Sequence, residues 1–386
     1  MGRRAPGLDW ILMGAAMALV VLGTLLVWSA TSARPALTGD DPTAYLKKQL
    51  VNVAIGLVLL VMVLATDHRW LRIVAPLAYL ASIVGLVLVL VMGTTVNGSR
   101  SWLMLGGMSI QPSEFAKLAV VLGMGLLVAE RSEGSWRRRV GSGDVLGMLA
   151  IAGVPAALIL LQPDLGTMLV LSATVFGVLA VAGAQRRWLV GLTGAGVGAA
   201  VLAVGLGFLK PYQLDRFMAF TNPDLDPRGA GYNVEQARIA IGNGGIFGQG
   251  LFDGSQTKSG FVPEQHTDFI FTVAGEELGL IGAGAMIALL AIIVWRCLAI
   301  AMHAEDMFGR VTAAGIACWI GFQSFQNIGM CLGIMPVTGV PLPFVSYGGS
   351  SMFAGMLALG LVQNIHLRST SSLPTRFVPS RVLVPR

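Results

Sequence analysis

Residues 10–30 read WILMGAAMALVVLGTLLVWSA, an apolar run that contains no charged side chain. A run of about 17–25 apolar residues crosses the hydrocarbon core of a bilayer as a single helix. Ten such segments follow one another, at about 9–30, 49–66, 72–93, 113–130, 145–161, 164–183, 188–209, 269–295, 308–331 and 347–366. The pattern predicts an all-α polytopic membrane protein, a bundle of about ten transmembrane helices.

Composition supports this fold class and excludes several others. Of the 386 residues, 55% are hydrophobic and 12% are charged, whereas soluble domains contain about 25% charged residues. A soluble globular enzyme and a disordered chain are therefore both excluded. The three cysteines and four histidines are scattered, so neither a disulfide framework nor a metal site is indicated. No phosphate-binding or dinucleotide glycine motif lies between a strand and a helix, so no nucleotide cofactor is expected.

Basic residues predict the orientation of the bundle. With the N-terminus in the cytoplasm, 16 of the 26 Lys and Arg residues fall on the cytoplasmic side, nine fall outside, and Lys117 lies within a span. Cytoplasmic loops of membrane proteins carry such an excess. We therefore expect both termini in the cytoplasm, and we attribute the formal charge of +6 to topology, not to nucleic-acid binding.

The chain is expected to form one integral-membrane domain over residues 1–368. Its outer loop, at about 210–268, is far longer than the others, and loops beyond about 12–15 residues are usually functional or disordered. Within it, the apolar stretch 234–246 predicts one or two short amphipathic helices on the surface. Residues 369–386 form a polar tail whose ending, LVPR, resembles the remnant of a protease site.

Ionisable residues at membrane depth mark candidate sites, because a charge there costs at least about 2.5–3.5 kcal/mol. Glu114 and Lys117 open the fourth span and lie on one helical face. They form either a structural ion pair or the lining of a polar cavity that opens outward. Asp164 follows Pro163 between two spans, where it either caps a helix or contacts a substrate.

The stretch from Pro263 to Phe271, PEQHTDFIF, is the strongest candidate site. It joins the long loop to the predicted eighth span, and it contains Glu264, His266 and Asp268. Partial desolvation by the neighbouring phenylalanines would raise the pKa of Asp268 toward that of a useful base, although a loop-end cap is the alternative. Glu276 and Glu277 would follow about 12 Å deeper along the same helix.

The last outer loop, Thr338 to Ser351, contains two prolines and a Gly-Gly pair. Non-helical backbone persists at membrane depth only where protein or a water-filled cavity satisfies it. We therefore expect a re-entrant loop beside a cavity, in which Ser346 and Ser350 bind polar groups. A simple Gly-Gly packing contact is equally compatible with the sequence.

These motifs together resemble the SEDS family (shape, elongation, division and sporulation), whose members are polytopic peptidoglycan glycan polymerases. The resemblance covers about residues 10–368, and within the family the stretch 335–344 is most similar to the branch that acts in cell elongation. The motifs that carry it are Asn97–Trp102, Gln111–Lys117, Gln162–Thr167, Gly231–Asn233, Ala240–Gly245, Pro263–Phe271, Glu276–Gly279 and Pro341–Ser351.

The resemblance implies a substrate and a reaction. The substrate would be lipid II, whose disaccharides are joined by β-1,4 bonds with inversion at the anomeric carbon and release of undecaprenyl diphosphate. The residue matching the family's essential aspartate is Asp268, the expected general base. Cations would stabilise the leaving diphosphate. They would be a divalent ion, Mg²⁺ or Mn²⁺, held with the diphosphate, or basic residues on the outward side, namely Lys48, Arg100, Lys117 and Arg216.

The resemblance also implies a location and a partner. The protein would lie in the bacterial inner membrane with its active site facing the periplasm. It would work with a class B penicillin-binding protein, a transpeptidase whose single helix could pack on small residues of the eighth and ninth spans. The alternatives are a lipid II flippase, which would alternate access between the two faces, and a scaffold without catalytic activity.

Overall fold

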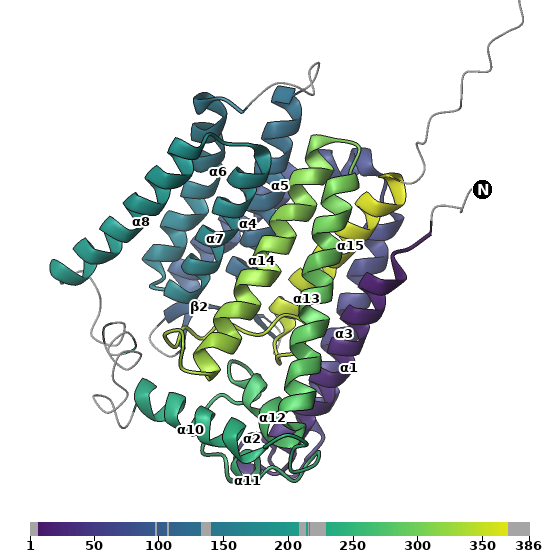
Figure 1. Cartoon of the computed structure of the whole chain (residues 1–386), viewed down its shortest axis with the longest axis vertical. Helices are drawn as coiled ribbons and strands as arrows, with labels where there is room; N and C mark the ends of the chain where they lie inside the picture. Colours follow the sequence, from purple (N-terminus) through teal and green to yellow (C-terminus); the bar gives the residue numbers. More distant parts are fainter. Residues whose placement is uncertain are drawn as a thin grey trace, which may run out of the picture.

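The computed structural model describes residues 7–96, 99–105, 108–132, 140–207, 214, 216 and 229–369. In this part of the chain, long helices run side by side as a bundle (Figure 1). They are α1 (Trp10–Ser32), α3 (Ala44–Ala65), α4 (His68–Met92), α5 (Pro112–Ser132), α6 (Ser142–Leu161), α7 (Leu165–Ala182), α8 (Arg186–Gly205), α13 (Gly279–His303), α14 (Met307–Cys331) and α15 (Gly349–Ser369). The fold class predicted from the sequence is confirmed.

Eight of these helices are long and apolar enough to cross a membrane: all except α14 and α15. Those two are of similar length but carry buried amides, among them Gln323, Asn327, Gln363 and Asn364. They lie among the other helices, where polar side chains find partners within the protein. Each of the ten predicted segments thus overlaps one long helix.

Aspartates start several of the helices. The carboxylate of Asp9 accepts a hydrogen bond from the backbone N–H of Leu12 at the start of α1. Asp306 does the same for Gly309 in α14. Such caps satisfy backbone donors that have no partner within the helix.

Small residues set the close packing of the core. A Cβ atom added at Gly315 of α14 would lie 2.7 Å from a methyl carbon of Val121 in α5 and 2.8 Å from one of Val178 in α7. Only glycine permits the three helices to approach this closely. The high glycine content therefore has a packing role at this position.

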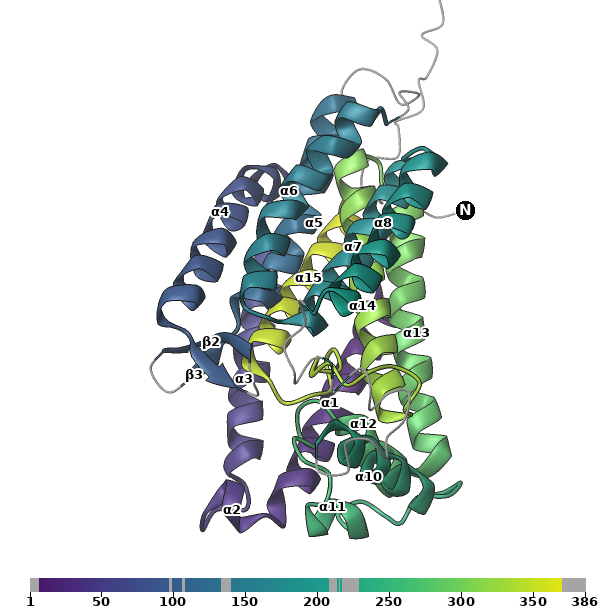
Figure 2. The same ribbon diagram turned by 90° about the vertical axis from the view of Figure 1, so that its left-hand side faces the viewer.

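Short elements gather at one end of the bundle (Figures 1 and 2). They are α2 (Pro35–Thr38), α10 (Ala230–Asn243), α11 (Ser255–Ser259) and α12 (Ile270–Glu277). Helix α10 matches the predicted amphipathic stretch, and it turns Val234, Ala237 and Ala240 toward the protein. The rest of the long loop, apart from 214, 216 and 229 onward, lies outside the described residues, as do the basic loop 133–139 and the tail after 369.

The predicted eighth span, 269–295, is wrong in its boundaries. The helix breaks at Leu278, because α12 ends at Glu277 and α13 starts at Gly279, whose φ is +66°. The span runs from Gly279 to His303. Glu276 and Glu277 therefore end the short helix α12 and do not lie within the membrane-spanning helix, where the prediction had placed them. Their carboxylates accept hydrogen bonds from α11 and α1, respectively.

A small antiparallel sheet connects α4 to α5, and the sequence reading did not anticipate it. Its strands are β1 (Thr94–Val96), β2 (Ser99–Leu105) and β3 (Met108–Ile110). The order is β1-β2-β3, with Thr95 opposite Arg100 and Leu103 opposite Ile110. β1 and β3 have only three residues each, and the seven residues of β2 do not alternate between polar and apolar, so no strand periodicity is visible in the sequence.

Candidate active site

Asp268 lies where three parts of the chain meet. It closes a turn in which the carbonyl of Glu264 accepts N–H bonds from Thr267 (3.2 Å), Asp268 (3.0 Å) and Phe269 (3.3 Å). The side chain of Asn327 in α14 donates to the Asp268 carbonyl at 2.7 Å. These bonds fix the backbone of Asp268 relative to the bundle.

The segment 332–348 forms a second wall of the site. The same Asn327 amide donates to the carbonyl of Val340 at 2.7 Å, and the N–H of Tyr347 donates to the carbonyl of His266 at 3.0 Å. Apart from short turns, the segment is irregular, and Val340, Leu342, Phe344 and Val345 are buried. The predicted non-helical loop inside the protein is thus present.

The Asp268 carboxylate faces this segment. A Cβ atom added at Gly339, where φ is +69°, would lie 3.1 Å from Oδ2 of Asp268. The side chain is half-buried. Burial, with help from the charges of Glu264 and Asp164 and against the charge of Arg216, raises the pKa of Asp268 to about 7. A carboxylate with this pKa can accept a proton near neutral pH.

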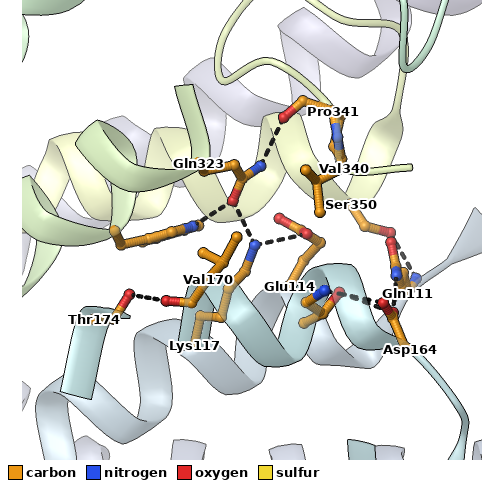
Figure 3. A network of polar contacts seen from close by, with 12 residues as sticks. Gln111, Glu114, Lys117, Asp164, Val170, Thr174, Gln323, Val340, Pro341 and Ser350 are labelled. Carbon is orange, nitrogen blue, oxygen red and sulfur yellow. Dashed lines mark hydrogen bonds and ion pairs between the residues drawn. The ribbon is translucent and has the colours of Figure 1, made fainter. Parts of the chain in front are cut away.

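A buried polar network runs across the bundle next to this wall (Figure 3). The Lys117 ammonium donates to Glu114 at 2.7 Å and to the Gln323 side chain at 2.7 Å. Gln323 in turn donates to the carbonyl of Pro341 at 2.8 Å. Lys117 and Glu114 have exposed side-chain fractions of 0% and 1%. The predicted ion pair exists, and it links α5 through α14 to the segment that carries Gly339.

Asp164 joins the same network at the start of α7. It caps the helix by accepting from the Thr167 N–H at 2.9 Å, and the Gln111 amide donates to its other oxygen at 3.2 Å. The N–H of Gln111 donates to the Ser350 hydroxyl at 2.8 Å. Asp164 is therefore a cap, and its charge also acts on Asp268.

His266 lies in an aromatic cluster beside the turn. Its ring is 5.0 Å from that of Tyr45 and 5.7 Å from that of Tyr347. Burial, and secondly the charge of Arg34, lowers the pKa of His266 to about 4, so the ring is neutral at pH 7. Its Nδ1 atom is buried without a hydrogen-bond partner. Lys48 lies over the Tyr45 ring, 5.1 Å from its centre.

The remaining candidates are placed differently. Arg100 donates to the carbonyls of Gly93 (2.7 Å) and Val91 (3.0 Å), so it binds the end of α4. The Ser346 hydroxyl accepts from the Leu342 N–H at 2.8 Å, within the segment 332–348. Arg216 lies close enough to Asp268 to act on its pKa.

The sequence reading missed the amides that hold the site together. Gln323 and Asn327 lie one helical turn apart on α14, and both are buried. The sequence-based prediction singled out only ionisable residues at membrane depth, although any polar side chain there needs a partner. Gln323, Gln326 and Asn327, at helical spacing in an apolar run, were the signal that could have identified them.

The described residues contain no group of three His, Cys, Asp or Glu side chains that could hold a metal ion. A protein-only metal cage is therefore not part of the site in this portion of the chain. An ion would need most of its ligands from a bound substrate.

The fold and the site define a polytopic membrane protein that holds a carboxylate of raised pKa, that of Asp268, at one end of its bundle. Residues 9–371 match the model of the cell cycle protein family named for FtsW, RodA and SpoVE. The chain belongs to this family, and the SEDS assignment is confirmed.

Relatives from three branches are similarly close. The chain is 38% identical over 360 residues to the probable peptidoglycan glycosyltransferase FtsW of Trichlorobacter lovleyi, covering 92% of each chain. It is 37% identical over 359 residues to the peptidoglycan glycosyltransferase MrdB of Escherichia coli, covering 93% of each. Stage V sporulation protein E of Bacillus subtilis is 36% identical over 364 residues, covering 92% of this chain and 96% of that one.

Solved structures show the same fold. One, described as the structural coordination of polymerization and crosslinking by a peptidoglycan synthase complex, gives a TM-score of 0.76 at 33% identity, covering 95% of this chain and 99% of that one. The rod shape determining protein RodA of Thermus thermophilus gives a TM-score of 0.67 at 32% identity, covering 93% and 97%.

Proposed function

We propose that the chain is a peptidoglycan glycosyltransferase that polymerises lipid II into β-1,4-linked glycan. The observation that carries the proposal is the carboxylate of Asp268, a residue whose backbone carbonyl is held by Asn327 at the meeting point of three segments, with a pKa of about 7. The family membership and the names of the relatives support the reaction class.

In the proposed mechanism Asp268 acts as the general base. It takes the proton from the 4-hydroxyl of the acceptor sugar as that oxygen attacks the anomeric carbon of the donor. The bond to the diphosphate breaks from the opposite side, so the configuration inverts and undecaprenyl diphosphate leaves. A positioned base contributes about 10²–10⁴-fold to such a step.

The leaving diphosphate needs positive charge, and we propose which of the candidate cations supply it. Arg216, whose charge reaches Asp268, and the exposed Lys48 are placed to supply it. Lys117 is fully buried and bound to Glu114 and Gln323, so we assign it to positioning the segment 332–348. Mg²⁺ or Mn²⁺ bound to the diphosphate would add charge without requiring a protein cage.

We further propose that the end of the bundle carrying Asp268 faces the periplasm of a bacterial inner membrane, with both termini in the cytoplasm. The excess of Lys and Arg on the opposite side supports this orientation. The elongation branch is the proposed biological setting, since the stretch 335–344 favours it over division.

A class B penicillin-binding protein is the proposed partner, and the synthase complex among the structural neighbours supports it. Helix α14 is almost wholly buried, so of the two predicted docking spans only α13 offers a broad apolar face. That face includes Leu280, Ile281 and Trp295, which are exposed.

The function is tested with the purified full chain and fluorescent lipid II in liposomes. We expect a ladder of glycan products on a gel, strengthened by the transpeptidase. Movement of lipid II between leaflets without glycan formation would support the flippase instead. If the chain shows neither activity, only the scaffold alternative remains. Rescue of a strain depleted of its elongation polymerase, but not of one depleted of its division polymerase, tests the branch.

A further inference from the structure

An open groove of about 630 Å³ lies along α8, with the start of α6 at its mouth, away from the candidate active site. It is lined by Ser142, Arg187, Trp188, Gly191, Leu192 and Ala195. Helix α7 starts next to the site at Asp164 and ends just before α8. Its 18 residues separate the groove from the site by about 27 Å along the bundle.

One face of α8 forms a wall of the groove. Arg187, Gly191 and Ala195 follow at four-residue spacing, with Trp188 and Leu192 beside them. The wall is therefore polar at the helix start and apolar or small further along. A Cβ atom added at Gly191 would meet no atom within 4 Å, so the groove is open there.

The mouth of the groove is rich in hydrogen-bond donors. The Arg187 guanidinium donates to the Ser142 hydroxyl at 2.9 Å, and the Trp188 ring N–H donates to the same oxygen at 3.4 Å. The Ser142 proton and the other guanidinium N–H groups can still donate to a ligand. The nearby carboxylate of Asp144 is already paired with Arg131 at 2.8 Å.

Helix geometry adds positive potential at the same place. Both α6 and α8 begin at the mouth, and the start of α8 has no side-chain cap. The N-terminal end of a helix carries a partial positive charge. Within the described chain, α8 buries none of its residues, and it lies at the outer edge of the bundle (Figure 1).

We propose that this groove binds one anionic phospholipid. The phosphate lies at the mouth against Arg187, Ser142 and Trp188, and an acyl chain lies along Gly191 and Ala195. Arg and Trp are typical of the headgroup level of a membrane, and basic pockets between helices select anionic headgroups. A zwitterionic lipid offers the same chains, but its own cation would face Arg187.

Native mass spectrometry of the purified full chain, titrated with phosphatidylglycerol or phosphatidylcholine of matched chains, tests the proposal. We expect the wild type to retain one phosphatidylglycerol in preference to phosphatidylcholine. Arg187→Ala removes the positive charge at the mouth of the groove. Gly191→Leu adds a side chain that fills the open part of the groove beside Gly191. Arg187→Ala should lower retention about fivefold, the ~1 kcal/mol that one basic residue contributes near an anionic lipid. Gly191→Leu should lower it at least as much.

Arg186→Ala is the matched control, because this neighbouring arginine is also exposed but does not line the groove. It should change retention less than the other two variants. Equal retention of both lipids, no effect of Gly191→Leu, or an equal loss in Arg186→Ala would each overturn the proposal. So would a retained species with the mass of undecaprenyl diphosphate. Gly191→Leu adds a side chain into open space, so it remains informative if Arg187→Ala fails to fold.

Discussion

At the scale of single residues, the charge of Glu264 tunes the carboxylate of Asp268. Glu264 is exposed, and after burial its charge is the next cause of the raised pKa of Asp268. A general base works only when deprotonated, so polymerisation should rise with pH and level off above about 7. A pH–rate profile of the wild type between about pH 5 and 9 checks this.

Glu264→Gln should move that profile. Removing the negative charge lowers the pKa of Asp268, so the acid limb should shift to lower pH while the plateau rate stays near that of the wild type. The same assay, run side by side, measures the shift. An unchanged limb with a large loss of plateau rate would instead indicate that Glu264 contacts the substrate.

Gly339 should be sensitive to a single added methyl group. An alanine at φ +69° costs about 1–2 kcal/mol, and its Cβ would lie 3.1 Å from Oδ2 of Asp268. Displacing the carboxylate should reduce polymerisation about tenfold or more. Gly333→Ala is the control, because Gly333 has φ +73° in the same segment but its added Cβ would meet Val234, not Asp268. Equal activity losses in the two variants would argue that only backbone strain matters.

At the scale of elements, two adjacent carboxylates hold the short helices in different ways. Glu276 is buried and accepts bonds from the N–H groups of Gln256 (2.7 Å) and Thr257 (2.9 Å) at the start of α11. The Thr257 hydroxyl is a further donor to it, at 2.7 Å. Glu277 accepts from Ser29 of α1 and from the backbone of Phe252 and Gly254, but burial outweighs these bonds and raises its pKa.

Glu276→Gln should therefore destabilise the protein more than Glu277→Gln. The first variant weakens several bonds to a charged acceptor, each contributing about 1.5–3 kcal/mol. The second removes a charge that its surroundings disfavour. Thermal unfolding in detergent, measured for both variants, checks the order. A larger loss in Glu277→Gln would contradict the role assigned to Glu276.

The sequence predicted the long helices because a bilayer leaves the backbone few alternatives. It did not predict the break at Leu278, because hydropathy does not report the φ of +66° at Gly279, and the two glutamates before the break were read as part of one continuous helix. The sheet between α4 and α5 was missed because β1 and β3 are only three residues long and β2 does not alternate between polar and apolar residues.

For the site, the pairing of Glu114 with Lys117 followed from the sequence, whereas Asp268 precedes the short helix α12 and not the membrane span itself. The amides of Gln323 and Asn327 did not follow from the sequence, since their importance lies in contacts between distant segments. The sequence likewise treated Arg100 as a cation for substrate, and only the three-dimensional structure shows it bound to the end of α4.

At the scale of the whole molecule, the proposed orientation predicts which ends react with impermeant thiol reagents. Ser259→Cys, in α11, should be labelled from the periplasmic side of intact cells, and Glu305→Cys, between α13 and α14, only after the membrane is opened. Both positions are exposed, whereas the native cysteines are buried or half-buried. The reverse labelling pattern would show that the bundle has the opposite orientation in the membrane, with Asp268 on the cytoplasmic side.

The central claim is that Asp268 is the catalytic base, and stability separates this role from a structural one. The pKa of Asp268 is raised from 3.8 to about 7 in the folded chain. The folded protein thus holds the proton more tightly, and the ionised carboxylate opposes folding increasingly as the pH rises from about 4 to 7. Asp268→Asn, which carries no charge, should therefore melt at the same temperature as the wild type or higher at about pH 8.

The most direct test is the rate of glycan formation from labelled lipid II by purified Asp268→Asn at about pH 8, beside the wild type. Asp253→Asn, an exposed carboxylate of the same loop that pairs with Lys258, is the control and should polymerise normally. We predict that Asp268→Asn stays folded, still binds lipid II and polymerises at least ~10²-fold more slowly. A folded, lipid II-binding Asp268→Asn protein that polymerises at near the wild-type rate would contradict the account.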